Sequence, residues 1–235
     1  ELIMVDDGCP EGSGTIANEI IKRENLEEHC QVLFLENAIH QKLPVVDGLN
    51  STSDSQKGGS VEFGMWHAAT NSKEENHIIV FTDADLSTHL GQLGLLLDPI
   101  LHKDKQAAIA SRRETNSVVV KQSARNNRGK LFIYIWKRLI PELHYLIDTQ
   151  CGFKAFKKEA VLSICENTIE KKFAFDIELL LRTELADKHS IEKVGTAWID
   201  SEAASTTTDI QPYLPMLKSI AKMYRTYLPP NPNSE

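Results

Sequence analysis

The chain alternates short apolar runs with longer segments in which apolar residues recur every three or four positions. Short runs rich in Val, Ile and Phe are typical of buried strands. They predict strands at Leu2–Val5, Gln31–Leu35, Ile78–Thr82, Ala107–Ser111, Gly152–Phe156 and Ile191–Ile199. Helical spacing predicts helices at Thr15–Glu28, Gly58–Ala69, Leu90–Leu101, Lys121–Tyr145 with a break at Pro141, Lys158–Cys165, Asp176–Leu185 and Pro212–Tyr227.

Strands that alternate with helices predict an α/β fold with helices on both faces of the sheet. We expect a three-layer α/β/α, Rossmann-like domain with a mostly parallel central sheet, and one domain over residues 1–235. Residues 36–55 read as a long polar loop, and residues 229–235 as a flexible Pro/Asn-rich tail.

The strand Ile78–Thr82 runs directly into two acidic residues, Asp83 and Asp85. Open α/β sheets bind ligands at the carboxyl ends of their strands. Alternation along an extended backbone would turn both carboxylates to one side, about 7 Å apart. Mg²⁺ typically takes one or two carboxylates together with phosphate oxygens. The pair therefore predicts a metal-dependent phosphate or nucleotide site.

Two further groups are expected near this edge of the sheet. Asp6 and Asp7 end the first strand and could accept hydrogen bonds from a base or ribose, although a turn or N-cap aspartate explains them equally well in isolation. Lys57 and Gly58 open a helix, where a lysine and the helix N-terminus favour an anion. This second signal is weak because the motif is not a Walker A sequence.

Basic residues follow the strand Ala107–Ser111. Arg112 closes that strand, and Arg125 and Arg128 follow at the start of the next helix. Arginine forks at such a place suit a phosphate, whereas solvated surface is the plain alternative. The later string D-T-Q-C-G-F-K-A-F around Gln150 is unusual for a structural turn. In F-A-F-D-I-E-L-L, Asp176 interrupts an apolar run at the head of a helix, where a carboxylate is either a cap or a group that acts as a base or orients an acceptor.

Composition excludes several classes of protein. A formal charge of −7 argues against general nucleic-acid binding. The four cysteines show no CxxC spacing, so neither a zinc site nor a thioredoxin-type pair is indicated. No apolar run suits a membrane-spanning helix and no signal peptide is visible, so we expect a cytoplasmic protein with reduced thiols.

The order of the motifs V-D-D-G, K-G-G-S-V-E-F-G-M, F-T-D-A-D-L-S, A-S-R-R, D-T-Q-C-G-F-K-A-F and F-A-F-D-I-E-L-L resembles that of family-2 glycosyltransferases with the GT-A fold. Within them the chain is most similar to the dolichyl-phosphate β-glucosyltransferase and polyprenyl-phosphate sugar transferase branch. The resemblance covers roughly residues 2–198 and lacks the first strand of the family, so we expect that strand to be missing from this sequence.

The resemblance implies an inverting, metal-dependent hexosyltransferase. The donor would be a nucleotide diphosphate sugar, UDP-glucose first, and the acceptor a polyprenyl or dolichyl phosphate. Mg²⁺ or Mn²⁺ would bind Asp85 and Asp83. The roles implied by matching positions are as follows: nucleotide-sugar binding by Asp6, Asp7, Lys57, Gly58, Asp83 and Asp85, and catalysis or acceptor binding by Arg112, Arg125, Arg128, Gln150 and Asp176.

Several alternatives stay open. GDP-mannose or a soluble acceptor would change the substrates, and a relative that binds the nucleotide sugar without transfer would change the activity. A haloacid-dehalogenase-type phosphohydrolase also places an apolar strand before D-x-D, but its later acidic pair is missing here, because the adjacent Asp6 and Asp7 lie upstream. The terminal helix carries Leu214 and Tyr224 on one face and Lys218 on another, which suits either core packing or a peripheral position at the cytosolic face of a membrane.

Overall fold

The computed structural model describes residues 1–120, 126–200 and 213–228, with the backbone alone for 126–132 and 213. Arg125 and the tail at 229–235 lie outside the described residues, as does the side chain of Arg128. The strands are β1 (Leu2–Asp6), β2 (Cys30–Phe34), β3 (Ile78–Thr82), β4 (Ala107–Ser111), β5 (Val118–Val120), β6 (Phe153–Lys157), β7 (Ile191–Gly195) and β8 (Ala197–Ile199). The helices are α1 (Ser13–Arg23), α2 (Leu35–His40), α3 (Gly58–Asn71), α4 (Leu93–His102), α5 (Asn126–Leu139), α6 (Lys158–Ile164), α7 (Phe175–Ala186) and α8 (Tyr213–Tyr227).

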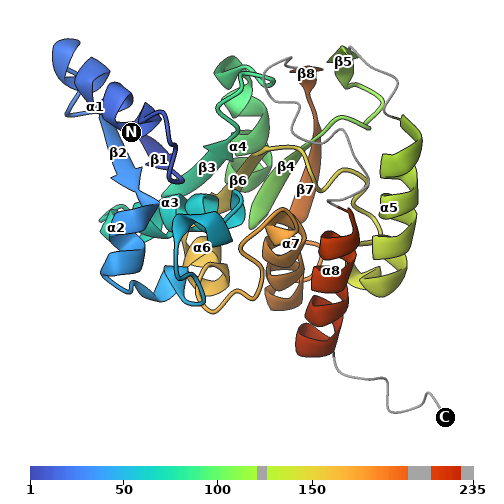
Figure 1. Ribbon diagram of the computed structural model, residues 1–235. Coiled ribbons are helices and arrows are strands. Elements are labelled where there is room, and N and C mark those ends of the chain that lie inside the picture. Colours follow the sequence, from blue (N-terminus) through green and yellow to red (C-terminus); the bar gives the residue numbers. More distant parts are fainter. Residues whose placement is uncertain (121–125, 201–212, 229–235) are drawn as a thin grey trace.

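A four-stranded sheet in the order β3-β6-β4-β7 forms the centre of the molecule (Figure 1). Helix α4 packs on one face, and α3, α6 and α7 lie against the strands from the other side. Alternate residues of β4 point to opposite faces of the sheet. Ala107 and Ile109 pack in the main core beneath α3, α6 and α7, whereas Ala108 and Ala110 pack in the smaller core beneath α4. The predicted three-layer α/β/α arrangement is therefore confirmed.

The strand directions bring the predicted site residues to one edge. Strand β6 runs antiparallel to both β3 and β4, so β3 and β4 run in the same direction, and β7 is parallel to β4. The carboxyl ends of β3 and β4 therefore lie beside the amino end of β6, where Thr82 pairs with Phe153. Asp83 directly follows β3, Arg112 directly follows β4, and Gln150 lies three residues before β6.

The central sheet is mixed, which corrects the expectation of a mostly parallel one. Two of its three ladders involve β6 and are antiparallel. Two parallel pairs, β1 with β2 and β5 with β8, form separate small sheets. The predicted strand Ile191–Ile199 is divided at Thr196, because β7 pairs with β4 while β8 pairs with β5.

Residues 36–55 are not a long polar loop, and that prediction was wrong. They contain most of α2 and two 3₁₀ turns, Pro44–Val46 and Thr52–Asp54. Ala38, Val45 and Val46 are almost completely buried in the main core. The apolar residues are too widely spaced to form a run, but together they cover one side of the fold.

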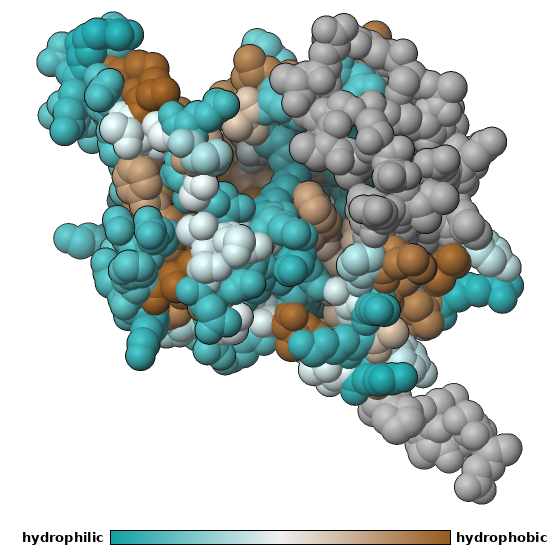
Figure 2. All heavy atoms as spheres, viewed as in Figure 1, coloured by the Kyte–Doolittle hydropathy of each residue, from teal (hydrophilic) through white to brown (hydrophobic). Residues whose placement is uncertain are grey.

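Helix α8 packs on the core, but through a different face from the one predicted. Met216, Ile220 and Met223 are buried, whereas Leu214 is 63% exposed. Helix α8 contacts α5 and α7. Most of the surface seen in Figure 2 is hydrophilic, with apolar residues in small, separate groups.

Candidate active site

The candidate site begins with an ion pair at the carboxyl end of β3. Lys57 Nζ lies 2.6 Å from Asp83 Oδ1. The backbone N–H of Asp83 donates to the carbonyl of Gly152 across the ladder, at 2.9 Å. A Cβ on Gly152 would lie 2.0 Å from Asp83 Oδ2, so only glycine allows the carboxylate to lie against this strand.

Lys57 is the cation at the centre of a cluster of carboxylates. Burial lowers the pKa of Lys57, but the charges of Asp176, Asp83 and Asp85 outweigh it, so the pKa is raised overall. These carboxylates come from the end of β3 and from the first turn of α7, which are distant in sequence. The fold has therefore gathered four of the predicted site residues around one point.

Asp176 is buried and paired with a second lysine. Lys154 on β6 donates to Asp176 Oδ1, and the exposed fractions of the two side chains are 1% and 4%. Burial raises the pKa of Asp176 in spite of Lys154 and Lys57 nearby. A buried lysine–aspartate pair fixes the position of a charged group at the wall of the site.

Asp85 lies beyond the end of the strand. Because β3 ends at Thr82, strand alternation does not place Asp83 and Asp85 on one side, and that step of the sequence argument was wrong. Asp85 instead occupies a turn in which its Oδ1 accepts the backbone N–H of Ser87 at 2.9 Å. Within the described residues, no group of three or more His, Cys, Asp or Glu side chains is arranged to hold a metal ion.

Asp6 and Asp7, the first acidic pair, have different contacts. Asp6 accepts the backbone N–H groups of Gly8, Cys9 and Gly14 at 2.8 to 3.0 Å, so its carboxylate holds the turn before α1. Asp7 Oδ2 accepts the N–H of Lys57 at 3.1 Å, which links β1 to the cluster. Burial raises the pKa of Asp7, and its Oδ1 is buried without a partner in the described part of the chain.

Arg112, at the end of β4, is partly buried and forms a forked ion pair with the buried Asp148. Its Nε and Nη2 each donate to Asp148 at 2.7 Å, and its backbone N–H donates to the same carboxylate at 2.9 Å. The guanidinium lies over the ring of Trp198, 5.1 Å from the centroid. Burial opposes ionisation of Asp148, but Arg112 outweighs it and lowers the pKa of Asp148 overall. Most of the hydrogen-bonding capacity and the charge of Arg112 is therefore already used by Asp148.

Gln150 lies just before β6, with Nε2 buried and unpartnered within the described chain. Gly58, which is predicted to bind the nucleotide sugar, lies in close contact with another loop. An added Cβ would lie 2.6 Å from the carbonyl carbon of Lys171, and the next amide, of Gly59, donates to the Lys171 carbonyl at 3.0 Å. The glycine therefore permits close contact with another loop, and this amide at the start of α3 is not open to an anion.

Sequence reasoning missed two residues of the site, Lys154 and Asp148. Both lie in the string D-T-Q-C-G-F-K-A-F, which is unusual for a turn, and both are buried. A charged residue within the apolar strand F-K-A-F-K was the available signal for Lys154, because a buried lysine requires a partner. Nothing in the local pattern distinguishes Asp148 from a turn aspartate.

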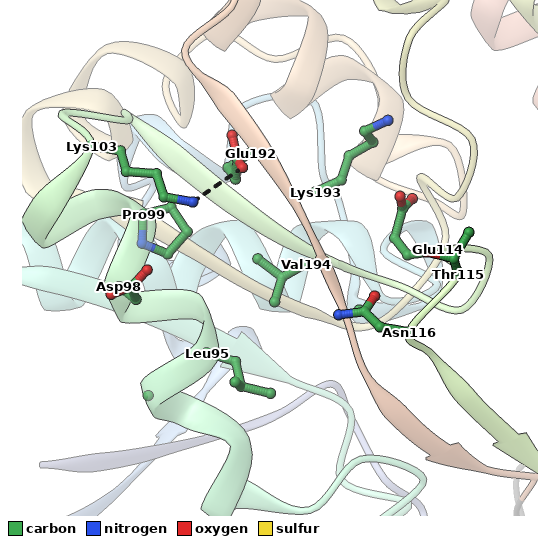
Figure 3. Close-up of a pocket in the computed structure, with 12 residues that line it drawn as sticks. Leu95, Asp98, Pro99, Lys103, Glu114, Thr115, Asn116, Glu192, Lys193 and Val194 are labelled. Carbon is green, nitrogen blue, oxygen red and sulfur yellow. Dashed lines mark ion pairs between the residues drawn. The ribbon is translucent and has the colours of Figure 1, made fainter.

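A separate hollow of about 500 Å³ lies beside the edge strand β7 (Figure 3). It is lined by side chains of both signs, including Lys103, Glu114 and Glu192, with Lys103 Nζ 3.5 Å from Glu192. None of the clustered residues Lys57, Asp83, Asp85 and Asp176 lines it. We therefore place the site at the carboxylate cluster, where unlike charges and buried polar atoms converge.

The chain is similar in sequence to dolichyl-phosphate β-glucosyltransferases. The one from Trichomonas vaginalis is 25% identical over 211 residues, covering 87% of this chain and 56% of the relative. The one from Saccharomyces cerevisiae is 25% identical over 246 residues, covering 97% and 65%. The chain thus spans less than two thirds of the length of these relatives. No family model matches it.

Solved structures share the fold. Glucosyl-3-phosphoglycerate synthase from Mycobacterium tuberculosis, in complex with Mn²⁺, UDP-glucose and phosphoglyceric acid, superposes with a TM-score of 0.66 at 17% identity, over 95% of this chain and 68% of that one. Mannosyl-3-phosphoglycerate synthase from Rubrobacter xylanophilus gives 0.64 at 14% identity, over 95% and 63%.

No helix in the described ranges is both long and apolar enough to span a membrane. The motif order, the relatives and the superpositions agree with one another. The chain has the GT-A fold, and the resemblance to family-2 glycosyltransferases, with dolichyl-phosphate β-glucosyltransferases as sequence relatives, is confirmed.

Proposed function

We propose that the chain catalyses inverting transfer of glucose from UDP-glucose to a polyprenyl phosphate such as dolichyl phosphate. The observation that carries the proposal is the cluster of Lys57 with Asp83, Asp85 and Asp176 at the carboxyl edge of the sheet. The names of the sequence relatives, which are dolichyl-phosphate β-glucosyltransferases, support both the sugar and the acceptor. We place the reaction at the cytosolic face of a membrane.

The cluster suits a divalent cation that takes its remaining ligands from a diphosphate. Asp85 and Asp83 supply hard oxygen donors, and Mg²⁺ or Mn²⁺ there would take its remaining ligands from phosphate oxygens. Mg²⁺ or Mn²⁺ held there would offset charge on the leaving nucleotide. Mn²⁺ is our first choice, because it accompanies UDP-glucose in a solved structure of the same fold.

The chain's own residues would bind and orient both substrates. Asp7, whose Oδ2 is held by the N–H of Lys57, would accept a hydrogen bond from an N–H of the base. Lys57 offsets part of the negative charge of three carboxylates, and together with a bound divalent cation it would let a diphosphate approach them. Asp176, held by Lys154, would orient the sugar or the acceptor at the wall of the site.

The acceptor needs positioning more than deprotonation. A phosphate monoester has a second pKa of about 6 and is largely ionised at neutral pH, so attack on the anomeric carbon does not depend on a general base. Asp148 occupies Nε and Nη2 of Arg112, which leaves Nη1 for a phosphate. Arg125 and Arg128 stay predictions for the same role.

An exposed aliphatic face supports a lipid acceptor over a soluble one. Val118, Val120 and Ile199 are 64%, 51% and 59% exposed on the two-stranded sheet of β5 and β8. The alternate residues of these strands, Val119 and Trp198, face the other way, and Trp198 lies under Arg112. The aliphatic face thus lies on the opposite side of this small sheet from Trp198 and Arg112, and it is linked to the site through the hydrogen bond from Ile199 N–H to the Ser87 carbonyl at 3.0 Å.

The first test is release of UDP from UDP-glucose by purified protein with Mn²⁺ or Mg²⁺, with and without a short polyprenyl phosphate. We expect stimulation by the acceptor, and a loss of at least 100-fold in Asp85→Ala. Parallel reactions with GDP-mannose, and with 3-phosphoglycerate as a soluble acceptor, test the alternative substrates. Acceptor-independent or absent release with every pair would overturn the proposal.

A further inference from the structure

A buried charged pair lies behind the site and takes no part in the chemistry proposed above. Glu62 on α3 is fully buried, and its Oε2 accepts hydrogen bonds from Lys171 Nζ and Thr168 Oγ1, each at 2.7 Å. Lys171 Nζ also donates to the carbonyl of Val45 at 2.7 Å. Burial raises the pKa of Glu62 to about 7 in spite of the neighbouring ammonium group. Such a pair is weak evidence for stability alone, because desolvation offsets much of the attraction.

The pair lies where the start of α3 meets the loop that precedes α7. The backbone N–H of Gly59 donates to the Lys171 carbonyl at 3.0 Å. A Cβ on Gly58 would lie 2.7 Å from the Lys172 carbonyl oxygen, so the two backbones are in direct contact. One partner of this contact follows Lys57 in sequence, and the other precedes Asp176. The relative position of the two loops therefore sets that of the two site residues.

Lys57 needs such support because its backbone is strained. Its φ of 101° and ψ of −50° are unusual for a residue with a side chain. Its N–H donates to Asp7 at 3.1 Å, and its carbonyl accepts from Ser60 Oγ at 2.8 Å. A conformation of this kind persists only when the surrounding structure fixes it from several sides.

The loop before α7 is held from its other side as well. Glu178, in the first turn of α7, accepts the backbone N–H groups of Ile169 and Glu170 at 2.7 and 2.8 Å. It also accepts the hydroxyl of Tyr227 from α8. The loop is thus fastened to α7 by Glu178 and to α3 by Glu62.

We propose that Glu62, Thr168 and Lys171 are positioning residues that set Lys57 against Asp176. The proposal rests on the function proposed above and adds three residues that contact neither substrate. Their effect on transfer is indirect, through the spacing of the α3 and α7 N-termini. Displacement of a catalytic group by about 1 Å can reduce a rate by about 100-fold.

The test uses the double variant Glu62→Met/Lys171→Met, because paired replacement by apolar side chains avoids leaving one buried charge alone. We expect a folded protein whose kcat for UDP-glucose transfer falls about 10- to 100-fold. Amide hydrogen exchange should rise at residues 58–60 and 174–176. Thr168→Val should lower kcat to a smaller extent, and Thr168→Ser, which retains the hydroxyl, should restore it.

The matched control is Tyr145→Phe/Glu184→Gln. Glu184 is buried near the far end of α7, where it accepts hydrogen bonds from the hydroxyl of Tyr145 and from the N–H of His189. This control should lower the melting temperature without changing kcat. An unchanged kcat in Glu62→Met/Lys171→Met, or equal losses in the control, would overturn the positioning role.

The exchange measurement separates the two proposals. If the wild type transfers no sugar, the proposed function fails, but exchange at residues 58–60 and 174–176 still reports whether the pair fixes the two loops. Unchanged exchange there in Glu62→Met/Lys171→Met would reject the positioning role whatever the activity.

Discussion

Lys57 combines an unusual backbone conformation with an unusual electrostatic position. Its φ is 101°, and its ammonium group lies 2.6 Å from Asp83 and within the influence of Asp176 and Asp85. Removing it would leave Asp83 and Asp85 without their neighbouring ammonium group, so a diphosphate would meet stronger repulsion. Strain and charge at one residue are typical of functional sites, because natural sequences tolerate local strain mainly where function requires it.

Gly58 provides a direct test of the contact beside Lys57. Gly58→Ala should destabilise the protein by about 1–3 kcal/mol, because the new Cβ meets backbone atoms that cannot move aside. Its position would be 2.6 Å from the Lys171 carbonyl carbon. The matched control is Gly94→Ala in α4, where a Cβ meets nothing within 4 Å. That change should stabilise the protein by about 0.5–1 kcal/mol. Urea unfolding measures both, and equal effects of the two substitutions would contradict the close-contact account.

At the scale of elements, the small sheet of β5 and β8 brings its exposed face to the edge of the site. Ile199 N–H donates to the Ser87 carbonyl at 3.0 Å, two residues after Asp85. Leu86, which lies between Asp85 and Ser87 in the sequence, is 81% exposed. Leu86, Val120 and Ile199 are thus three exposed aliphatic side chains close to the end of β3. The chain of a lipid phosphate could lie there while its head group reaches the cluster.

Val120→Ser and Ile199→Ser test this surface. Loss of about 1 kcal/mol of apolar contact should raise the acceptor KM about fivefold for each substitution with a long polyprenyl phosphate. The effect should shrink as the chain is shortened, and the KM for UDP-glucose should not change. Leu101→Ser, an equally exposed side chain (58%) on α4, is the control. If the effect of these substitutions on the acceptor KM did not depend on the length of the polyprenyl chain, the lipid chain would lie elsewhere.

The sequence allowed most of the central elements to be predicted, because β3 and β4 are compact apolar runs with polar residues after them, and β6 has apolar residues at three of its five positions. It could not predict that β6 runs antiparallel, since a short apolar strand carries no mark of its direction. It also could not show whether a carboxylate faces a ligand or its own backbone. Asp6 and Asp7 are adjacent and chemically identical. Only the structure shows that Asp6 accepts hydrogen bonds from the turn before α1, whereas Asp7 accepts one from the N–H of Lys57.

At the scale of the whole molecule, the layer formed by β1, β2 and α1 is bound less firmly than the central sheet. Every residue of β4 is buried, whereas none of β1 or β2 is. In Figure 1 this layer projects at one end of the molecule, where β1 and β2 pair only with each other. Elements with few buried contacts open at lower free energy than the core.

Hydrogen exchange should therefore show two levels of protection. We expect amides of β1 and β2 to exchange much faster than those of β4 and β6, because they can open without unfolding the core. Since Asp7 follows β1 and bonds to Lys57, UDP with Mn²⁺ should slow exchange in β1 more than in β4. Asp85→Ala, measured under the same conditions, should lose this slowing while keeping the two levels in the free protein. Equal protection of the amides in both sheets would show that the molecule opens as one unit. If UDP slowed exchange only in β4, Asp7 would not be part of the nucleotide site.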